Sequence, residues 1–282
     1  MITYRALLHR FQLTCDEPVA DGYLRQVLAP LRERSVGEGP VTHYEMVRHG
    51  SSSVVGKLLV DGDVSSTEAS TTGPIGRFLQ LVDRAAERVT AESFPVLHAA
   101  ACHRAGRTIV LPGPANAGKS TLTAHLTASG WTYLSDELVA IMPGEPPRIL
   151  PYPRSIVLDE GSWSLFPGKM QPIPGELSTQ LPHRRHLVPA EESRARIGTS
   201  HPITDVVLYH WKAGLTEQVS ELDAVECLRC LLGSSFSVDR SPRRDLDALA
   251  RVVEDAACWR LEGDRFDRVQ RLLARPSSVR CT

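Results

Sequence analysis

The chain has 282 residues, 42% of them hydrophobic and 23% charged, which is an ordinary composition for a globular protein of one large domain or two modest ones. Its formal net charge of −1 gives no overall field that would attract nucleic acid or a membrane surface, and neither is expected as a partner. No apolar run approaches the ~20 residues of a membrane span. The beginning of the chain does not resemble a signal peptide and the six cysteines are scattered, so we expect reduced thiols and a cytoplasmic location.

Residues 1–90 are interpreted as a small N-terminal α+β portion. Apolar periodicity and turn residues predict its elements in this order: a strand at 2–13, a helix capped by Asp21 that runs to Leu31, strands at 41–47 and 53–60 joined around His49-Gly50, and an amphipathic helix at 75–89.

Residues 91–282 are interpreted as an α/β domain with a mixed central sheet. The predicted elements are a strand at 96–103, a hairpin turn at 105–107, a strand at 108–111, a helix from Thr121 that Gly130 ends, a strand, acidic turn and strand over 132–141, strands at 155–158 and 203–211, helices around 221–232 and 242–256, an edge strand at 258–261 and a last helix around 264–274. Between them, the irregular segment 161–198 carries His183-Arg184-Arg185-His186. It is either a solvated basic loop or a flap over phosphate or an acidic substrate.

Cys227 and Cys230 form a C-x-x-C pair. The pair lies within a stretch whose apolar spacing is typical of the core face of a helix, and no second pair follows at zinc spacing. We therefore interpret both as structural thiols rather than as a metal or redox site.

The stretch Gly113-Pro114-Ala115-Asn116-Ala117-Gly118-Lys119-Ser120 matches G-x-x-x-x-G-K-[ST], the phosphate-binding loop, between a predicted strand and a predicted helix. Glycines let backbone N–H groups turn toward an anion, and the helix N-terminus adds partial positive charge. Lys119 can then reach the β- and γ-phosphates and Ser120 can ligate Mg²⁺. We expect ATP and Mg²⁺ as cofactors, with the nucleotide held by Gly113, Pro114, Ala115, Asn116, Ala117, Gly118, Lys119, Ser120 and Thr121.

Two consecutive acids, Asp136 and Glu137, follow the apolar strand after the phosphate-loop helix. In most folds of this kind, an acidic residue at the end of a neighbouring strand holds the metal ion or its water. The metal-ligand prediction is therefore Ser120, Asp136 and Glu137. A carboxylate within reach of an acceptor hydroxyl could also take its proton during phosphoryl transfer.

With these motifs, residues 94–160 resemble the HPr kinase/phosphorylase family, which shares a core with phosphoenolpyruvate carboxykinases. Three matches carry the resemblance: Leu97-His98-Ala99 one hairpin before the loop, the loop itself, and Ser135-Asp136-Glu137-Leu138-Val139. It implies a P-loop core of the HPr kinase/PEP carboxykinase type with a mixed central sheet. The shorter branch of the family, which includes serine kinases of lasso-peptide precursors, is similar in the Pro-Arg segment that contains Arg154.

The resemblance also implies roles for individual residues. Asp136 would be the general base, Glu137 would help to hold Mg²⁺, and His98 would tune the charge of the acidic group. Arg154 would stabilise the transferring group, together with Lys119. The second acid is Glu where the family has Asp, and the family's Gly-rich signature after the acidic strand is missing. Neither phosphorylase activity nor HPr as the substrate is therefore carried over.

The predicted function is an ATP-dependent kinase that acts on a hydroxyl, serine above all, of a peptide or protein, in the maturation of a peptide natural product. The alternatives are a kinase of a small hydroxylated metabolite and a regulatory ATP-binding module without transfer. A carboxykinase is disfavoured by the short chain and a GTPase by the lack of an Asn-Lys-x-Asp motif. A homo-oligomer is left open.

Overall fold

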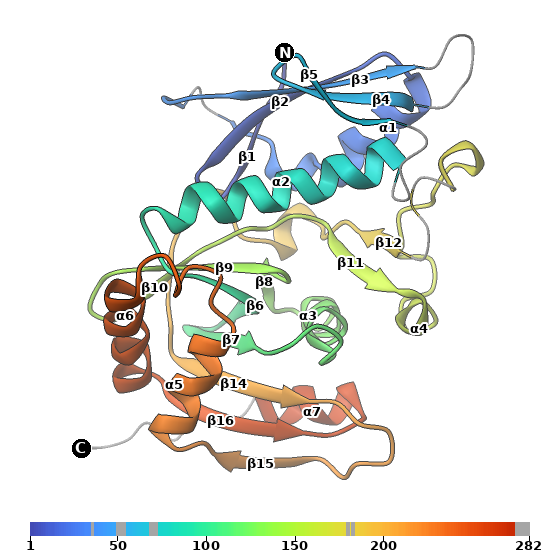
Figure 1. Cartoon of the computed structure of the whole chain (residues 1–282). Helices are drawn as coiled ribbons and strands as arrows, with labels where there is room; N and C mark the ends of the chain where they lie inside the picture. The colour runs from blue at the N-terminus through green and yellow to red at the C-terminus, as the bar shows by residue number, and fades with distance from the viewer. Residues whose placement is uncertain (35–36, 49–54, 68–72, 179–180, 182–183, 274–282) are drawn as a thin grey trace. The chain divides into compact units, whose positions relative to one another are not determined.

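The computed structural model describes residues 1–34, 37–48, 55–67, 73–178, 181 and 184–273 (Figure 1). The chain forms two compact units. The first unit comprises Met1–Val89 and Arg154–Pro189, and the second comprises Thr90–Pro153 and Ala190–Thr282. The sequence-based division into 1–90 and 91–282 left the segment 154–189 with the second part. Its Pro-, Gly- and charge-rich sequence has no period that could reveal which strands it accompanies.

The first unit contains a five-stranded sheet in the order β1-β2-β3-β4-β5. Its strands are β1 (Thr3–Ala6), β2 (His9–Cys15), β3 (Thr42–Arg48), β4 (Val55–Val60) and β5 (Asp63–Thr67). The pair β2–β3 is parallel, and the other pairs are antiparallel. Its helices are α1 (Pro18–Val27), a 3-10 turn at Ala29–Leu31 and α2 (Gly73–Ala91), which continues into the second unit.

Two details of this unit differ from the sequence-based prediction. The strand expected over 2–13 is two strands, because Leu7 takes φ 54 and reverses the chain between β1 and β2. Glu17, not Asp21, caps α1 by accepting a hydrogen bond of 2.5 Å from the Ala20 backbone N–H. The hairpin expected around His49-Gly50 lies outside the described residues.

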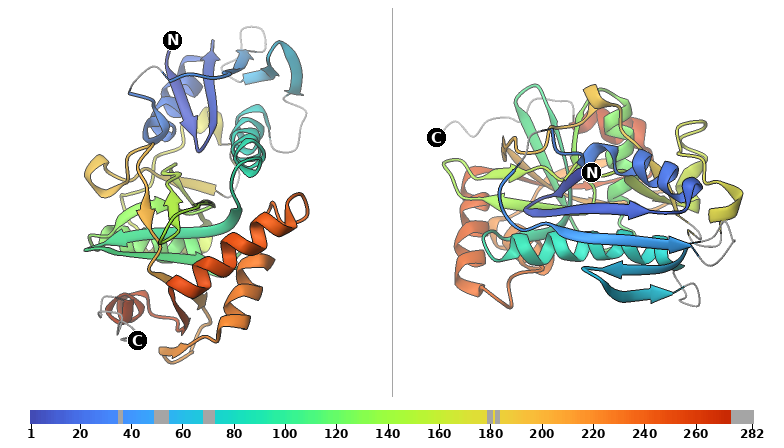
Figure 2. Two further views of the ribbon diagram at one scale, coloured as in Figure 1. Left: turned by 90° about the vertical axis from the view of Figure 1, so that its left-hand side faces the viewer. Right: turned by 90° about the horizontal axis from the view of Figure 1, so that it is seen from above.

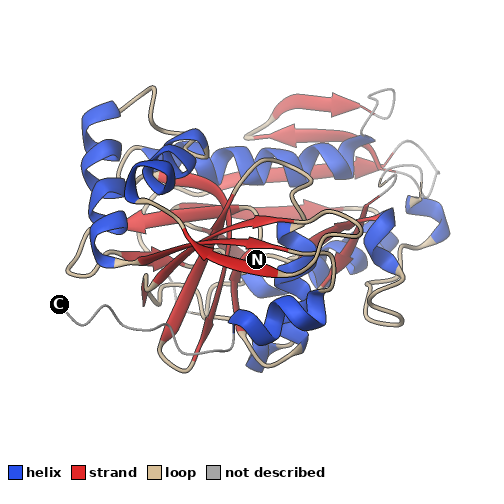
Figure 3. Ribbon diagram, turned by 90° about the horizontal axis from the view of Figure 1, so that it is seen from below, coloured by secondary structure: helices blue, strands red, loops and turns tan. Residues whose placement is uncertain are grey.

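Helix α2 runs along the five-stranded sheet (Figure 1, Figure 3), and Ile75, Phe78 and Val82 of the helix are buried. Phe78 of α2 meets two rings of the sheet edge-on, Tyr44 at 5.1 Å and Phe11 at 6.1 Å between ring centroids. All three side chains are buried. Aromatic pairs of this geometry add to the hydrophobic stabilisation, so this cluster joins the helix to the middle of the sheet.

Residues 154–189 add a two-stranded antiparallel sheet to the first unit. It pairs β11 (Ile156–Asp159) with β12 (Arg184–Leu187). A short helix, α4 (Glu160–Trp163), and a 3-10 turn at Gly175–Leu177 lie between them. The segment expected to be irregular thus contains regular structure, whereas His183 lies outside the described part of the chain.

The second unit is built on a nine-stranded sheet in the order β13-β10-β9-β6-β7-β14-β16-β15, with β8 paired to β6 beside this path. Its strands are β6 (Val96–Arg104), β7 (Arg107–Pro112), β8 (Thr132–Ser135), β9 (Leu138–Met142), β10 (Arg148–Leu150), β13 (His201–Pro202), β14 (Asp205–His210), β15 (Gln218–Glu221) and β16 (Ala257–Glu262). The pairs β7–β14 and β14–β16 are parallel and the others antiparallel. The prediction of an α/β fold with a mixed sheet is therefore confirmed.

The helices of this unit are α3 (Lys119–Ala128), α5 (Ala224–Gly233), α6 (Pro242–Asp255) and α7 (Phe266–Leu273), with a 3-10 turn at Glu191–Ser193. Helices α5 and α6 lie side by side (Figure 2). The strand expected at the edge, 258–261, is internal, because β15 pairs with its outer side. The residues of β15 are exposed, and only Val219 among them is apolar, so no apolar pattern predicted this strand.

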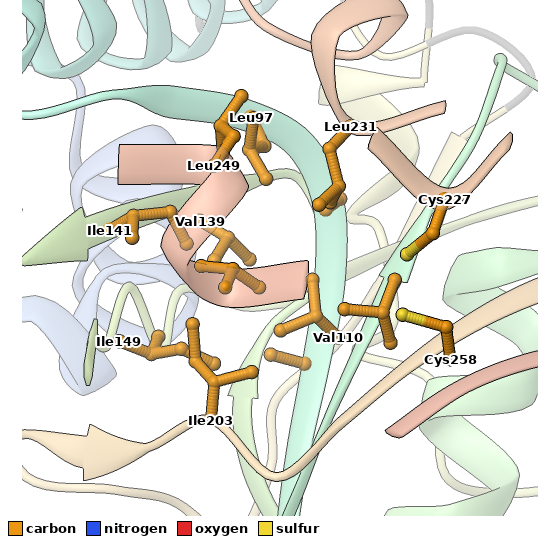
Figure 4. Packing of buried hydrophobic residues seen from close by; sticks show 14 of the residues in the cluster. Leu97, Val110, Val139, Ile141, Ile149, Ile203, Cys227, Leu231, Leu249 and Cys258 are labelled. Atoms are coloured by element: carbon orange, nitrogen blue, oxygen red, sulfur yellow. The ribbon is translucent and has the colours of Figure 1, made fainter. Parts of the chain in front are cut away.

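One core of this unit lies between the sheet and helices α5 and α6 (Figure 4). Leu231 and Leu249 come from these helices, and Leu97, Val110 and Val139 come from three neighbouring strands. Cys227 belongs to the same cluster and lies beside Cys258. Burial of apolar surface at roughly 25 cal/mol per Å² makes this cluster a main source of the stability of the unit.

Across the described residues, no helix combines the length and the apolar character that crossing a membrane would require.

Candidate functional site

The loop Gly113–Ser120, called the 113–120 loop below, connects β7 to α3, as predicted. Gly118 precedes the helix with φ 85, a backbone conformation that favours glycine. A Cβ at this position would lie 3.2 Å from both Trp211 Cβ and Tyr209 Cε1. Asn116 also has a positive φ, of 64, which Asn tolerates better than most residues. The positive φ values of Asn116 and Gly118 thus form a tight turn immediately before helix α3.

Lys119, the first residue of α3, folds its side chain back over the loop. Its ammonium donates to the backbone carbonyls of Gly113 at 2.8 Å and Pro114 at 2.7 Å, and the residue is 5% exposed. Burial lowers the pKa of Lys119, and the negative charges of Glu137 and Asp136 oppose this shift. The lysine charge is thus held at the loop, within electrostatic range of both predicted acids.

The acids lie in the turn between β8 and β9. Ser135 organises this turn: its hydroxyl donates to the Leu138 carbonyl at 2.7 Å and accepts from the Glu137 backbone N–H at 3.3 Å. Asp136 is 1% exposed and accepts a hydrogen bond of 2.8 Å from the Tyr133 hydroxyl. Tyr133 was not foreseen from the sequence, although it lies only three positions before the acid. The hydrogen bond fixes the orientation of the carboxylate.

His98 of β6 lies beside the second acid. Its Nε2 is 3.9 Å from Glu137 Oε1, and the Ala99 backbone N–H donates to the Glu137 carbonyl at 3.2 Å. Both side chains are partly exposed, His98 at 23% and Glu137 at 38%. Strand pairing is the reason for this contact, since β6 runs antiparallel to β9 with His98 opposite Leu138.

The structure therefore brings Lys119, Asp136, Glu137 and His98 into one site of the second unit. Ser120 and Thr121 follow Lys119 in the first turn of α3, both partly exposed. Arg154 belongs to the first unit, where its guanidinium lies 3.3 Å from the Asp83 carboxylate. A role of Arg154 in phosphoryl transfer stays a prediction.

A pocket of about 350 Å³ opens beside these groups. Gly113, Pro114 and His98 line one part of it, and the remaining lining residues are Leu208, Cys230, Gly233, Ser234, Ser235 and Phe236. Phe236 is 41% exposed, and its ring centroid lies 5.9 Å from that of His98. No motif in the sequence indicated that residues 230–236 lie next to His98.

The segment Ser234–Ser237 reaches this place by pairing with β6. The backbone N–H of His98 donates to the Ser234 carbonyl at 2.7 Å, and the backbone N–H of Phe236 donates to the Val96 carbonyl at 2.9 Å. Asp245 of α6, 0% exposed, accepts from the hydroxyls of Ser235 and Ser237. The buried carboxylate and the strand together fix the wall of the pocket.

A metal ion can be considered from the donors present. The described residues contain no group of three or more His, Cys, Asp or Glu side chains placed to hold a metal ion. Mg²⁺ does not need such a cage, because it keeps several waters and uses one or two carboxylates together with substrate phosphates. The pair Asp136 and Glu137, with the Ser120 hydroxyl, fits that donor set.

No family model matches the chain, and no curated protein matches it. Among solved structures it is similar to the Hpr(Ser) kinase/phosphatase from Coxiella burnetii, with 9% sequence identity and a TM-score of 0.31, over 63% of this chain and 93% of that chain. Membership of the family that the sequence resembles stays a prediction, and the proposals below depend on the site alone.

Proposed function

We propose that the protein is a Mg²⁺- and ATP-dependent kinase that phosphorylates a hydroxyl, serine above all, of a peptide or protein. One observation carries the proposal: a buried lysine is held on a glycine-bounded loop at a helix N-terminus, within electrostatic range of two adjacent carboxylates. A cation and the N-terminus of a helix bind phosphates, and carboxylates beside them can hold the metal ion and take a proton.

In the proposed reaction, Asp136 accepts the proton of the acceptor hydroxyl. The hydroxyl oxygen forms a bond to the γ-phosphorus, the bond from that phosphorus to the β–γ bridging oxygen breaks, and ADP leaves. Lys119 offsets the negative charge on the phosphates. Tyr133 holds Asp136 in place through its hydrogen bond, and His98 beside Glu137 limits the build-up of negative charge at the acidic turn.

The positions of the remaining residues suggest ligands for the metal ion and a surface for the nucleotide base. Mg²⁺ would be held by Ser120, Glu137 and Asp136 and would offset negative charge on the phosphates. Trp211, which is 43% exposed, lies against Gly118, and its indole N–H donates to the Asp264 carbonyl at 3.2 Å. It offers an aromatic face on which a nucleotide base can stack.

The test is transfer of radiolabelled γ-phosphate from ATP with Mg²⁺ to serine-containing peptides and to a whole-cell extract. We expect Lys119→Ala and Asp136→Asn each to lower the transfer rate by about 100-fold or more. Asp136→Asn should retain ATP binding, because Lys119, the loop backbone and the other proposed Mg²⁺ ligands, Ser120 and Glu137, stay in place. The matched controls Lys57→Ala and Asp239→Asn change exposed residues outside the site and should behave as the wild type.

Two outcomes would contradict the proposal in different ways. ATP binding without transfer to any acceptor, unchanged by Asp136→Asn, indicates a regulatory nucleotide-binding module. Transfer to small molecules of the extract, but to no peptide or protein, indicates a kinase of a hydroxylated metabolite.

A further inference from the structure

The pocket beside His98 has a lining that is poor in charge and in available donors. Leu208, Pro114, Cys230 and Phe236 present apolar atoms, and Gly113 and Gly233 have no side chain. Of the lining residues, His98 alone has an ionisable nitrogen base. A phosphate or a carboxylate would find no cationic lysine or arginine on these walls.

The two serines of the lining use their hydroxyl protons within the protein. Ser234 Oγ donates to the Cys230 carbonyl at 2.9 Å, and Ser235 Oγ donates to Asp245 Oδ2 at 3.1 Å. A polar ligand group buried in this pocket would lose its hydrogen bonds to water and gain few in return, which is costly. An apolar group avoids that cost.

The pocket is next to the groups that would carry out transfer. It shares Gly113 and Pro114 with the lysine, since the carbonyls of both residues accept from Lys119 Nζ. It shares His98 with the acidic turn, where Glu137 lies 3.9 Å away. A ligand seated in it thus lies beside the proposed reacting groups, whereas Trp211 offers the nucleotide base a separate aromatic face at Gly118.

The walls are also preorganised. Backbone hydrogen bonds tie Ser234 and Phe236 to β6, and the Asp245 carboxylate holds the serines between and after them. Arg244 in turn donates to Asp245 Oδ1 at 3.0 and 2.7 Å. A wall that is fixed before binding loses little conformational entropy when the ligand arrives.

We propose that this pocket receives the apolar side chain adjacent to the acceptor hydroxyl, so that the substrate is a peptide segment in which the phosphorylated residue neighbours a Leu-like or Phe-like residue. This inference rests on the proposed function, because it assigns the acceptor side of the same site. It sets the substrate class: an uncharged, apolar neighbour, and not an acidic or basic one.

The test compares fluorescein-labelled peptides with one serine flanked by Leu, Phe, Gly, Asp or Lys. Peptide binding is measured by fluorescence anisotropy in the presence of Mg²⁺ and a non-hydrolysable ATP analogue, and transfer is measured separately with radiolabelled ATP. We expect Leu and Phe peptides to bind about tenfold or more tightly than Gly, Asp and Lys peptides. Cys230→Phe, which fills the pocket, and Phe236→Ala, which removes one wall, should each abolish this preference.

Val225→Phe is the matched control, because it adds a phenyl ring at an exposed position of the same helix and should keep the preference. Equal binding of all peptides by the wild type, or a preference that survives both pocket variants, overturns the inference. So does a loss of ATP-analogue binding in Cys230→Phe with peptide preference intact, since the pocket would then hold the nucleotide base. Selective peptide binding without any transfer would instead overturn the proposed kinase function and leave the pocket assignment standing.

Discussion

Gly118 meets two separate requirements at one position. Its φ of 85 is unfavourable for any residue with a Cβ, and its hydrogen faces Trp211 and Tyr209, which a methyl group would approach to 3.2 Å. Gly130, after α3, has the similar φ of 89, but a methyl group there would meet no atom within 4 Å. A substitution at Gly130 would therefore introduce backbone strain alone, whereas the same substitution at Gly118 would add a steric clash with Trp211 and Tyr209.

We expect Gly130→Ala to lower the free energy of unfolding by about 1 kcal/mol and to leave ATP binding unchanged. Gly118→Ala should cost more stability, because strain and crowding add, and should weaken ATP binding by about tenfold or more. Urea unfolding followed by circular dichroism and titration with a fluorescent ATP analogue measure the two effects. Equal stability losses with equal ATP affinities would show that the aromatic contact at Gly118 has no consequence.

Site residues could be predicted where they form a motif of consecutive residues in the sequence. The 113–120 loop and the Asp136-Glu137 pair are such local patterns, and the structure brings both together with His98. Phe236, Cys230 and Tyr133 could not be predicted in the same way. Phe236 reaches the site because its segment pairs with β6, and Cys230 reaches it through the packing of α5; both depend on residues far away in the sequence. Tyr133 lies only three positions before Asp136, but it belongs to no recognisable motif.

At the scale of elements, the segment Ser234–Ser237 depends on one buried carboxylate. Asp245→Ala would leave the hydroxyls of Ser235 and Ser237 and the Arg244 guanidinium without their common acceptor. Leaving these donors without their acceptor costs about 3 kcal/mol. We expect that loss in urea unfolding, together with a raised KM for the peptide acceptor and an unchanged affinity for ATP.

The control is Asp247→Ala, which alters an exposed residue of the same helix and should change stability by less than about 0.5 kcal/mol. Asp245→Asn keeps an oxygen acceptor and should fall between the two. A stability loss in Asp245→Ala without any change in the acceptor KM would mean that the carboxylate supports the fold and not the pocket.

Elements with strong periodicity were predictable, and their neighbours in the sheet were less so. Helix α2 and the β6–β7 hairpin were predicted because the apolar residues recur at helical or strand spacing over many positions. The position of β16 between β14 and β15 could not be predicted, because a four-residue exposed strand with a single apolar residue, such as β15, pairs through its backbone and has no hydrophobic pattern.

At the scale of the whole molecule, histidines in both units that are buried, as His9 is, or partly buried, as His103 and His201 are, share one direction of pH dependence. Burial lowers the pKa of His9 to about 4, with a further contribution from the Arg88 charge and an opposing one from Asp61. In the second unit, burial lowers the pKa of His103 and of His201, whose rings lie 4.8 Å apart. All three are neutral in the folded protein at pH values where the unfolded chain already binds a proton.

The contribution of these histidines to the free energy of unfolding is therefore fully present above 6.5, their pKa in the unfolded chain. It is lost as the pH falls below that value. For His9 the loss amounts to roughly 3 kcal/mol by about pH 4. Urea unfolding at several pH values between about 7 and 4 should show this fall, and His9→Gln should flatten it. A stability that stays constant over this pH range, or that falls as steeply in His9→Gln, would contradict the assignment.

The hydrogen bonds of Lys119 to the carbonyls of Gly113 and Pro114 have a consequence for selectivity among anions. Any incoming anion competes with these two carbonyls for the Lys119 ammonium. The net affinity for the anion is therefore the free energy of its hydrogen bonds to Lys119 minus that of the hydrogen bonds it replaces. A small singly charged anion gains little by the exchange. Under the proposed function, a triphosphate would gain more, because it would also engage the loop backbone and a divalent cation. The internal hydrogen bonds of Lys119 thus favour ligands that bind to several groups of the 113–120 loop at once over small anions.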